Sequence, residues 1–171
     1  MLQKNWENKF INGILIKMKK IILILSLILL TSNCLAAMSN DSGGKTGLYK
    51  EAEKLVLKAK KLEKKDKVEK ALKLYSKAYD KLLKAYDKDK KNPNILNYLG
   101  YTLRKAGDFE KAEFYYLKGL ELDAGHLGIN EYLGELYVQT GKIELAKKRL
   151  AVLKGCGCEE YDELKELIEK K

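Results

Sequence analysis

Proline and histidine are almost absent from this chain of 171 residues, and each occurs once, as Pro93 and His126. Turns between short strands draw heavily on proline and glycine clusters, so the scarcity of proline argues against a sheet-rich protein. Lys, Glu, Leu and Tyr are abundant, and this composition favours helices. We therefore predict a single all-α domain after the N-terminal segment.

The residues that support catalysis or tight metal binding are equally scarce. The only histidine lies in a predicted turn, where we expect it to be solvated, and there are three cysteines. No nucleophile–base pair, carboxylate dyad or phosphate-binding glycine loop is found at a workable spacing. We predict that the protein is not an enzyme, takes no small-molecule substrate and needs no cofactor or metal.

The one long apolar run, residues 21–30, is interrupted only by Ser26 and follows the basic residues Lys19 and Lys20. Small residues close this segment at positions 36 and 37. A basic start, about ten apolar residues and a small-residue end are typical of a secretory signal peptide. We predict that residues 1–37 are an N-terminal extension plus signal peptide, that Met18 is the true start and that the mature protein is periplasmic.

Two alternatives to a secretory signal peptide remain open. The apolar run is short for a membrane span of about 20 residues, yet an uncleaved anchor helix would leave the protein facing the periplasm and touching the membrane only there. Lipid attachment at Cys34 is less favoured because Thr31, Ser32 and Asn33 are a poor approach to a lipidated cysteine.

Charge is distributed unevenly over the rest of the chain. Residues 38–91 carry 17 Lys and Arg against 9 Asp and Glu, whereas residues 92–171 carry 12 against 14. A basic half can meet an anionic lipid surface, a cell-wall polymer or an acidic protein. Its lysines fall between the apolar positions of a helical pattern, so we favour a solvated helix face. Without a nucleic-acid-binding motif, we predict no nucleic-acid partner.

Two segments match each other at a spacing of 34 residues, NYLGYTLRKAGDFEKAEFYYLKGLEL from position 97 and EYLGELYVQTGKIELAKKRLAVL from position 131. The matched pairs are Leu99 and Leu133, Gly100 and Gly134, Gly107 and Gly141, and Ala112 and Ala146. In this period and pattern the chain resembles the tetratricopeptide repeat (TPR) family. The resemblance implies a right-handed solenoid of about three helix-turn-helix repeats that binds a protein or peptide partner.

The repeated small residues have structural roles in this interpretation. We expect Gly100 and Gly134 at close contacts between the first and second helices of their repeats. Gly107 and Gly141 follow the first helices of their repeats, where a left-handed C-cap is usual, and Asp108 is placed to cap the next helix. Lys142 occupies the equivalent of Asp108 and predicts a weaker helix start.

The chain outside these two segments fits the same architecture. We predict a linker at residues 38–47 and a TPR domain at 48–171, with repeats at about 52–92, 93–126 and 127–158 and a capping helix at 159–170. The first repeat is seven residues longer because KAYDK occurs twice, at 77–81 and 84–88. Seven residues are nearly two helical turns, so we predict one long helix at about 68–89 with its apolar stripe intact.

The resemblance also implies which side chains line the concave groove. We expect Tyr98, Tyr101 and Tyr132 to be exposed on this face, with Arg104 and Glu135 beside them, because aromatic rings with polar edges suit peptide binding. A groove that clamps a peptide carboxylate is not predicted. The full predicted partner-binding groove consists of Asn97, Tyr98, Tyr101, Arg104, Lys105, Glu131, Tyr132 and Glu135.

Cys156 and Cys158 flank Gly157 just before the predicted capping helix. Short exported bacterial TPR proteins also have two cysteines before a terminal helix, and Cys158-Glu159-Glu160-Tyr161 resembles that motif. In an oxidising compartment we expect a disulfide that staples the cap. Two alternatives to an exported adaptor remain: a thiol redox or metal-handling protein that uses these cysteines, and a homodimer formed through the long basic helix.

Overall fold

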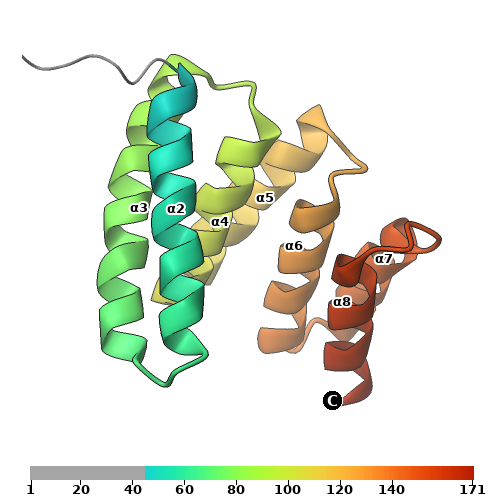
Figure 1. Ribbon diagram of the computed structural model, residues 1–171. Helices are drawn as coiled ribbons and strands as arrows, with labels where there is room; N and C mark the ends of the chain where they lie inside the picture. Colours follow the sequence, from blue (N-terminus) through green and yellow to red (C-terminus); the bar gives the residue numbers. More distant parts are fainter. Residues whose placement is uncertain (1–44) are drawn as a thin grey trace, which may run out of the picture. The chain divides into compact units, whose positions relative to one another are not determined.

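The computed structural model describes residues 45–171, and the predicted extension and signal peptide lie outside them. The described residues form seven helices and no strand, so the all-α prediction is confirmed (Figure 1). Consecutive helices pack in antiparallel pairs, and α8 closes the end of the stack (Figure 1). The helices are α2 (Lys45–Glu63), α3 (Val68–Lys88), α4 (Pro93–Ala106), α5 (Phe109–Leu122), α6 (Leu127–Gln139), α7 (Ile143–Leu153) and α8 (Glu159–Glu169).

The long basic helix forms as predicted. α3 spans Val68–Lys88, and its buried residues recur every three or four positions along its whole length. This spacing confirms that the inserted heptad keeps the apolar stripe on one side. Pro93 opens α4 at its first turn, where the missing N–H costs little. The buried residues of α3 are Ala71, Tyr75, Ala78, Leu82 and Ala85.

The start of the first helix differs from the prediction. The predicted linker reached residue 47, but α2 begins at Lys45. Leu48 and Tyr49 pack against the core of the first helical pair, so the turn of backbone that precedes them is held in the helix. The remainder of the predicted linker lies outside the described residues.

The turns inside the repeats follow the glycine pattern. Gly107 has φ 85° and ends α4, and Gly141 has φ 76° just after α6. The carboxylate of Asp108 accepts a hydrogen bond from the backbone N–H of Lys111 at 3.3 Å, whereas Lys142 makes no side-chain cap. The predicted C-caps and the weaker start of α7 are confirmed.

One of the two predicted glycine contacts is wrong. A Cβ atom at Gly100 would lie 2.5 Å from the ring of Tyr116 in α5, so Gly100 does lie between the two helices of its repeat. A Cβ atom at Gly134 would instead overlap the side chain of Leu164 in α8. The reason is that α8 folds back onto α6 and buries Leu164 there. The absence of a side chain at Gly134 therefore allows α8 to pack closely against α6.

The apolar interior is formed by two adjoining clusters, one centred on α2, α3 and α4 and the other on α5 to α8. Tyr79, Tyr115 and Tyr132 pack against both clusters and join them. Within the described residues, no helix has the combined length and apolarity required to cross a bilayer.

Candidate functional site

The inner face of the stack is built from tyrosines of four helices. The ring of Tyr101 in α4 lies 4.7 Å from the ring of Tyr132 in α6 and 5.7 Å from the ring of Tyr75 in α3. About one turn earlier in α4, the ring of Tyr98 lies 5.9 Å from that of Tyr49 in α2. The structure thus brings together Tyr101 and Tyr132, two of the predicted groove residues.

The predicted exposure of the three tyrosines on this face is wrong, and half of the eight predicted groove residues are buried. Tyr101 is only 4% exposed, and Tyr98, Lys105, Tyr132 and Glu135 are half-buried. Side chains from the first repeat cover α4: the Tyr75 hydroxyl lies 3.4 Å from the Tyr101 hydroxyl and donates to Glu63 at 2.7 Å. Tyr101 is therefore a core residue, and it is not an exposed anchor. The buried groove residues are Asn97, Tyr101, Arg104 and Glu131.

Two cations flank the tyrosine pair. The Lys60 ammonium donates to the Tyr132 hydroxyl at 3.2 Å and lies 5.5 Å from the Tyr101 ring centroid. The guanidinium of Arg104 lies 5.3 Å from the same ring and forms an ion pair with Glu135 at 2.5 Å. Both cations gain attraction from the ring faces, and the carboxylate of Glu135 offsets the desolvation of Arg104.

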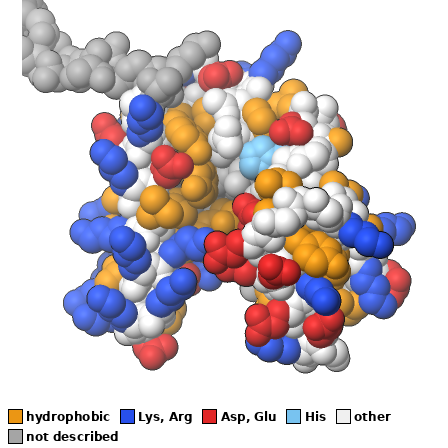
Figure 2. All heavy atoms as spheres, turned by 45° about the vertical axis from the view of Figure 1, so that its right-hand side comes forward, with side chains coloured by type: hydrophobic (Ala, Val, Ile, Leu, Met, Phe, Trp, Pro, Cys, Tyr) orange, Lys and Arg blue, Asp and Glu red, His pale blue; other side chains and the backbone are white. Residues whose placement is uncertain are grey.

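A cleft of about 320 Å³ opens beside Tyr132, and we call it the groove cleft. One side, the basic wall, consists of Lys60 and Lys61 in the last turn of α2 and Lys64 just after it. The other side, the acidic wall, consists of Glu159, Glu160 and Glu163 in α8. Figure 2 shows Lys and Arg side chains gathered on the left and Asp and Glu side chains facing them across a hollow. Leu57, Glu131 and Tyr132 complete the lining.

Glu131 lies at the base of the acidic wall and is 3% exposed. Burial raises its pKa to about 9, and its hydrogen bond to Glu163 and the charge of Glu135 act in the same direction. Glu131 therefore keeps its proton at neutral pH. Oxygen atoms of these three carboxylates lie within 4.8 Å of one another. Because one is protonated and Glu135 is paired with Arg104, we assign no metal to them.

Sequence reasoning missed the basic wall, although a signal for it exists. The first repeat is 41 residues long, so its groove positions lie 41 residues before those of the second repeat. Lys60 then corresponds to Tyr101, and Lys64 corresponds to Lys105. The prediction carried groove positions over only for the second and third repeats. The acidic wall had no such signal, because it belongs to the capping helix and depends on how α8 folds back.

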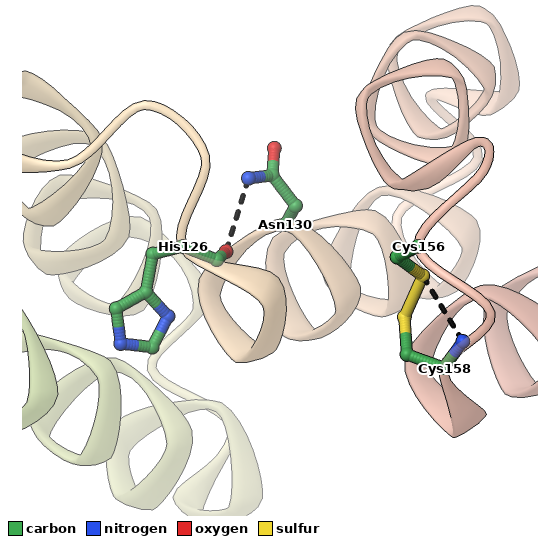
Figure 3. Close-up of a disulfide and its surroundings, with 4 residues drawn as sticks. All are labelled: His126, Asn130, Cys156 and Cys158. Carbon is green, nitrogen blue, oxygen red and sulfur yellow. Dashed lines mark hydrogen bonds between the residues drawn. A yellow bond between two sulfur atoms is a disulfide. The ribbon is translucent and has the colours of Figure 1, made fainter.

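The structure joins Cys156 and Cys158 in a disulfide in the turn between α7 and α8 (Figure 3). The N–H of Cys158 donates to the sulfur of Cys156 at 3.2 Å. Gly155 and Gly157 on either side of Cys156 have φ 90° and 62°, which glycine adopts readily. The disulfide therefore lies directly before the acidic wall.

His126 is half-buried and structured, so the expectation of a simply solvated histidine is wrong. It caps α6: its Nδ1 atom accepts from the N–H of Ile129 at 3.2 Å, and its carbonyl accepts from the Asn130 amide at 3.0 Å (Figure 3). Its Nε2 atom lies 3.1 Å from the Asn94 side-chain oxygen. Burial lowers the pKa of His126, which keeps the ring neutral for this capping role.

The tetratricopeptide repeat family model matches residues 93–126, which form α4, α5 and the turn that follows. The type III secretion translocator chaperone SycD of Yersinia enterocolitica is similar in structure, with a TM-score of 0.54 and 18% identity over 79% of this chain and 96% of that chain. The second TPR domain of human RPAP3, solved with the HSP70 peptide SGPTIEEVD, has a TM-score of 0.50 and 19% identity over 75% and 100% of the two chains. No curated protein matches this chain in sequence. The described residues thus have the TPR fold, and residues 93–126 are a TPR repeat.

Proposed function

We propose that this protein is an adaptor that binds an extended peptide segment of a protein partner in the groove cleft and along the adjoining faces of α4 and α6. The groove cleft itself carries the proposal: it is a concave site with a half-buried tyrosine, Tyr132, between walls of opposite charge. Such amphipathic rings provide broad contact area at low entropic cost, and the charged rim gives orientation. The human RPAP3 domain of the same fold holds a peptide.

The burial of the three groove tyrosines leaves two of them able to contact a bound peptide. Tyr98 and Tyr132 are half-buried, so each still presents part of its ring to the groove. Tyr101 lies beneath Tyr132 and fixes its ring. We therefore assign contact with the peptide to Tyr98 and Tyr132, and we assign to Tyr101, Arg104 and Glu135 the support of that surface.

The test is selection of binding peptides from a random library, followed by affinity measurement on variants. Changing Tyr98 and Tyr132 together to Ala should weaken binding of the selected peptides by about 2 kcal/mol, which is typical for the loss of central aromatic anchors. Phe114→Ala is the matched control, because Phe114 is 57% exposed on α5, outside the groove. If the selected peptides bind Phe114→Ala more weakly than the parent but bind the tyrosine variant as tightly as the parent, the binding site lies on the outer face and the proposal is wrong.

We also propose that the protein acts after export to the periplasm, with an uncleaved anchor helix as the alternative. The proposal is supported by the signal-like pattern at residues 18–37 and by the disulfide, since disulfides persist in oxidising compartments. N-terminal sequencing of protein from the periplasmic fraction should give a start near Ala37 or Met38. A product that retains residues 21–30 in the membrane fraction would favour the anchor.

A further inference from the structure

The two walls of the groove cleft carry unneutralised charge. Among the described residues, no ion pair joins the basic wall to the acidic wall. Lys61 and Lys64 are exposed, as are Glu159 and Glu163. A cleft with one cationic and one anionic wall offers complementary charge to a ligand that carries both signs.

The walls are held apart because each is fixed to a different part of the scaffold. Near the basic wall, Glu63 binds the Lys105 ammonium at 2.7 Å and accepts from Tyr75. Near the acidic wall, α8 is held by the burial of Leu164 against Gly134. The charges therefore stay on opposite sides without closing the cleft, and a ligand need not break an existing ion pair to enter.

The volume and the charge arrangement restrict the ligand. A cleft of about 320 Å³ is at the small end of ligand pockets, which run from about 300 to 1,000 Å³. It admits a short stretch of extended chain and no folded element. In an extended chain, successive side chains point to opposite sides, so neighbours in sequence meet opposite walls. Residues two apart meet the same wall.

We propose that the groove cleft selects an extended peptide segment in which acidic and basic residues alternate, the acidic side chains facing Lys60, Lys61 and Lys64 and the basic ones facing Glu159, Glu160 and Glu163. This inference rests on the proposed peptide-binding function and specifies its partner. A segment with all its charge of one sign satisfies one wall and is repelled by the other.

Two peptides of identical composition and zero net charge test the alternation, (Asp-Lys)4 and (Asp-Asp-Lys-Lys)2, both acetylated, amidated and fluorescently labelled. In an extended conformation the first has one acidic and one basic side, whereas each side of the second is mixed. At low salt we expect (Asp-Lys)4 to bind at least tenfold more tightly. The advantage should shrink as salt screens the exposed charges. Equal affinities, or no binding by either peptide, would overturn the inference.

Charge reversal of exposed wall residues tests the site. Lys61→Glu with Lys64→Glu should weaken (Asp-Lys)4 binding at least tenfold, and Glu159→Lys with Glu163→Lys should do the same. The fourfold variant should recover the affinity, because its walls are again opposite in sign. Lys147→Glu with Lys148→Glu, exposed on α7, controls for net charge, and circular dichroism checks each fold. If the fourfold variant binds (Asp-Lys)4 as weakly as the two double variants do, the two-wall site is contradicted.

The two proposals fail in different ways. Library peptides that depend on Tyr98 and Tyr132, together with equal binding of the two charged peptides, would uphold the groove and refute the charge pattern. If the tyrosine variant binds every selected peptide as the parent does, the groove itself is refuted.

Discussion

Replacing Glu131 by Gln should stabilise the protein at neutral and alkaline pH. Glu131 is 3% exposed, and its pKa is raised to about 9 by burial and by its two carboxylate neighbours. Between its ordinary value and pH 9, the native state therefore holds a proton that the unfolded chain releases. Since the unfolded state binds fewer protons, the free energy of unfolding falls as the pH rises through this window.

The size of the effect follows from the width of the window. Each pH unit between the two pKa values lowers the free energy of unfolding by about 1.4 kcal/mol. Glu131 alone therefore lowers the free energy of unfolding by at most about 3 kcal/mol between pH 4.5 and 7. Above pH 9 the loss levels off. Gln has the same shape and keeps an N–H donor toward Glu163, but its side chain does not ionise in this pH range. The Glu131→Gln variant therefore does not lose this stability as the pH rises.

The assay is urea unfolding followed by circular dichroism, with parent and Glu131→Gln compared at intervals from pH 4.5 to 9.5. We expect similar stability at pH 4.5 and a growing advantage of the variant up to about pH 9. His126 is common to both proteins, so its titration cancels in the comparison. Glu121→Gln, exposed on α5, controls for the substitution itself. An advantage that does not change between pH 5 and 9 would refute the protonated Glu131 and its buried site.

Two further predictions concern the capping helix. Gly134→Leu should destabilise the protein by about 1–3 kcal/mol, because the new side chain overlaps Leu164 and overpacks the α6–α8 contact; thermal melting equal to that of the parent would contradict this contact. The oxidised protein should show no free thiol at Cys156 or Cys158. Its reduction should speed hydrogen exchange in residues 159–171 before the rest, whereas unchanged exchange would show that the disulfide does not hold the cap.

The local elements were accessible to sequence reasoning because they depend on neighbouring residues. Gly107 needs a left-handed backbone, Pro93 suits a first helical turn, and the repeated KAYDK segment adds two turns to one helix. Each of these signals acts within a few positions along the chain. The helices they predicted form in the structure, with α3 ending one residue before its predicted end.

The groove was harder to predict because its surface depends on packing between repeats. Tyr101 is buried by Tyr75 and Lys60, which lie 26 and 41 residues earlier in the sequence. Gly134 contacts Leu164, which belongs to the capping helix and to no repeat. A family pattern gives the face on which a residue lies, but exposure depends on how tightly successive repeats curve and on what the cap covers.

The position of a bound peptide tests the central claim most directly. A selected library peptide carrying a photoreactive residue would be crosslinked to the protein and the attachment sites identified by mass spectrometry. Our account predicts crosslinks to α2, α4, α6 and α8 around Tyr98, Tyr132 and the groove cleft. Crosslinks confined to the outer faces of α3 and α5, around Phe114, would contradict it.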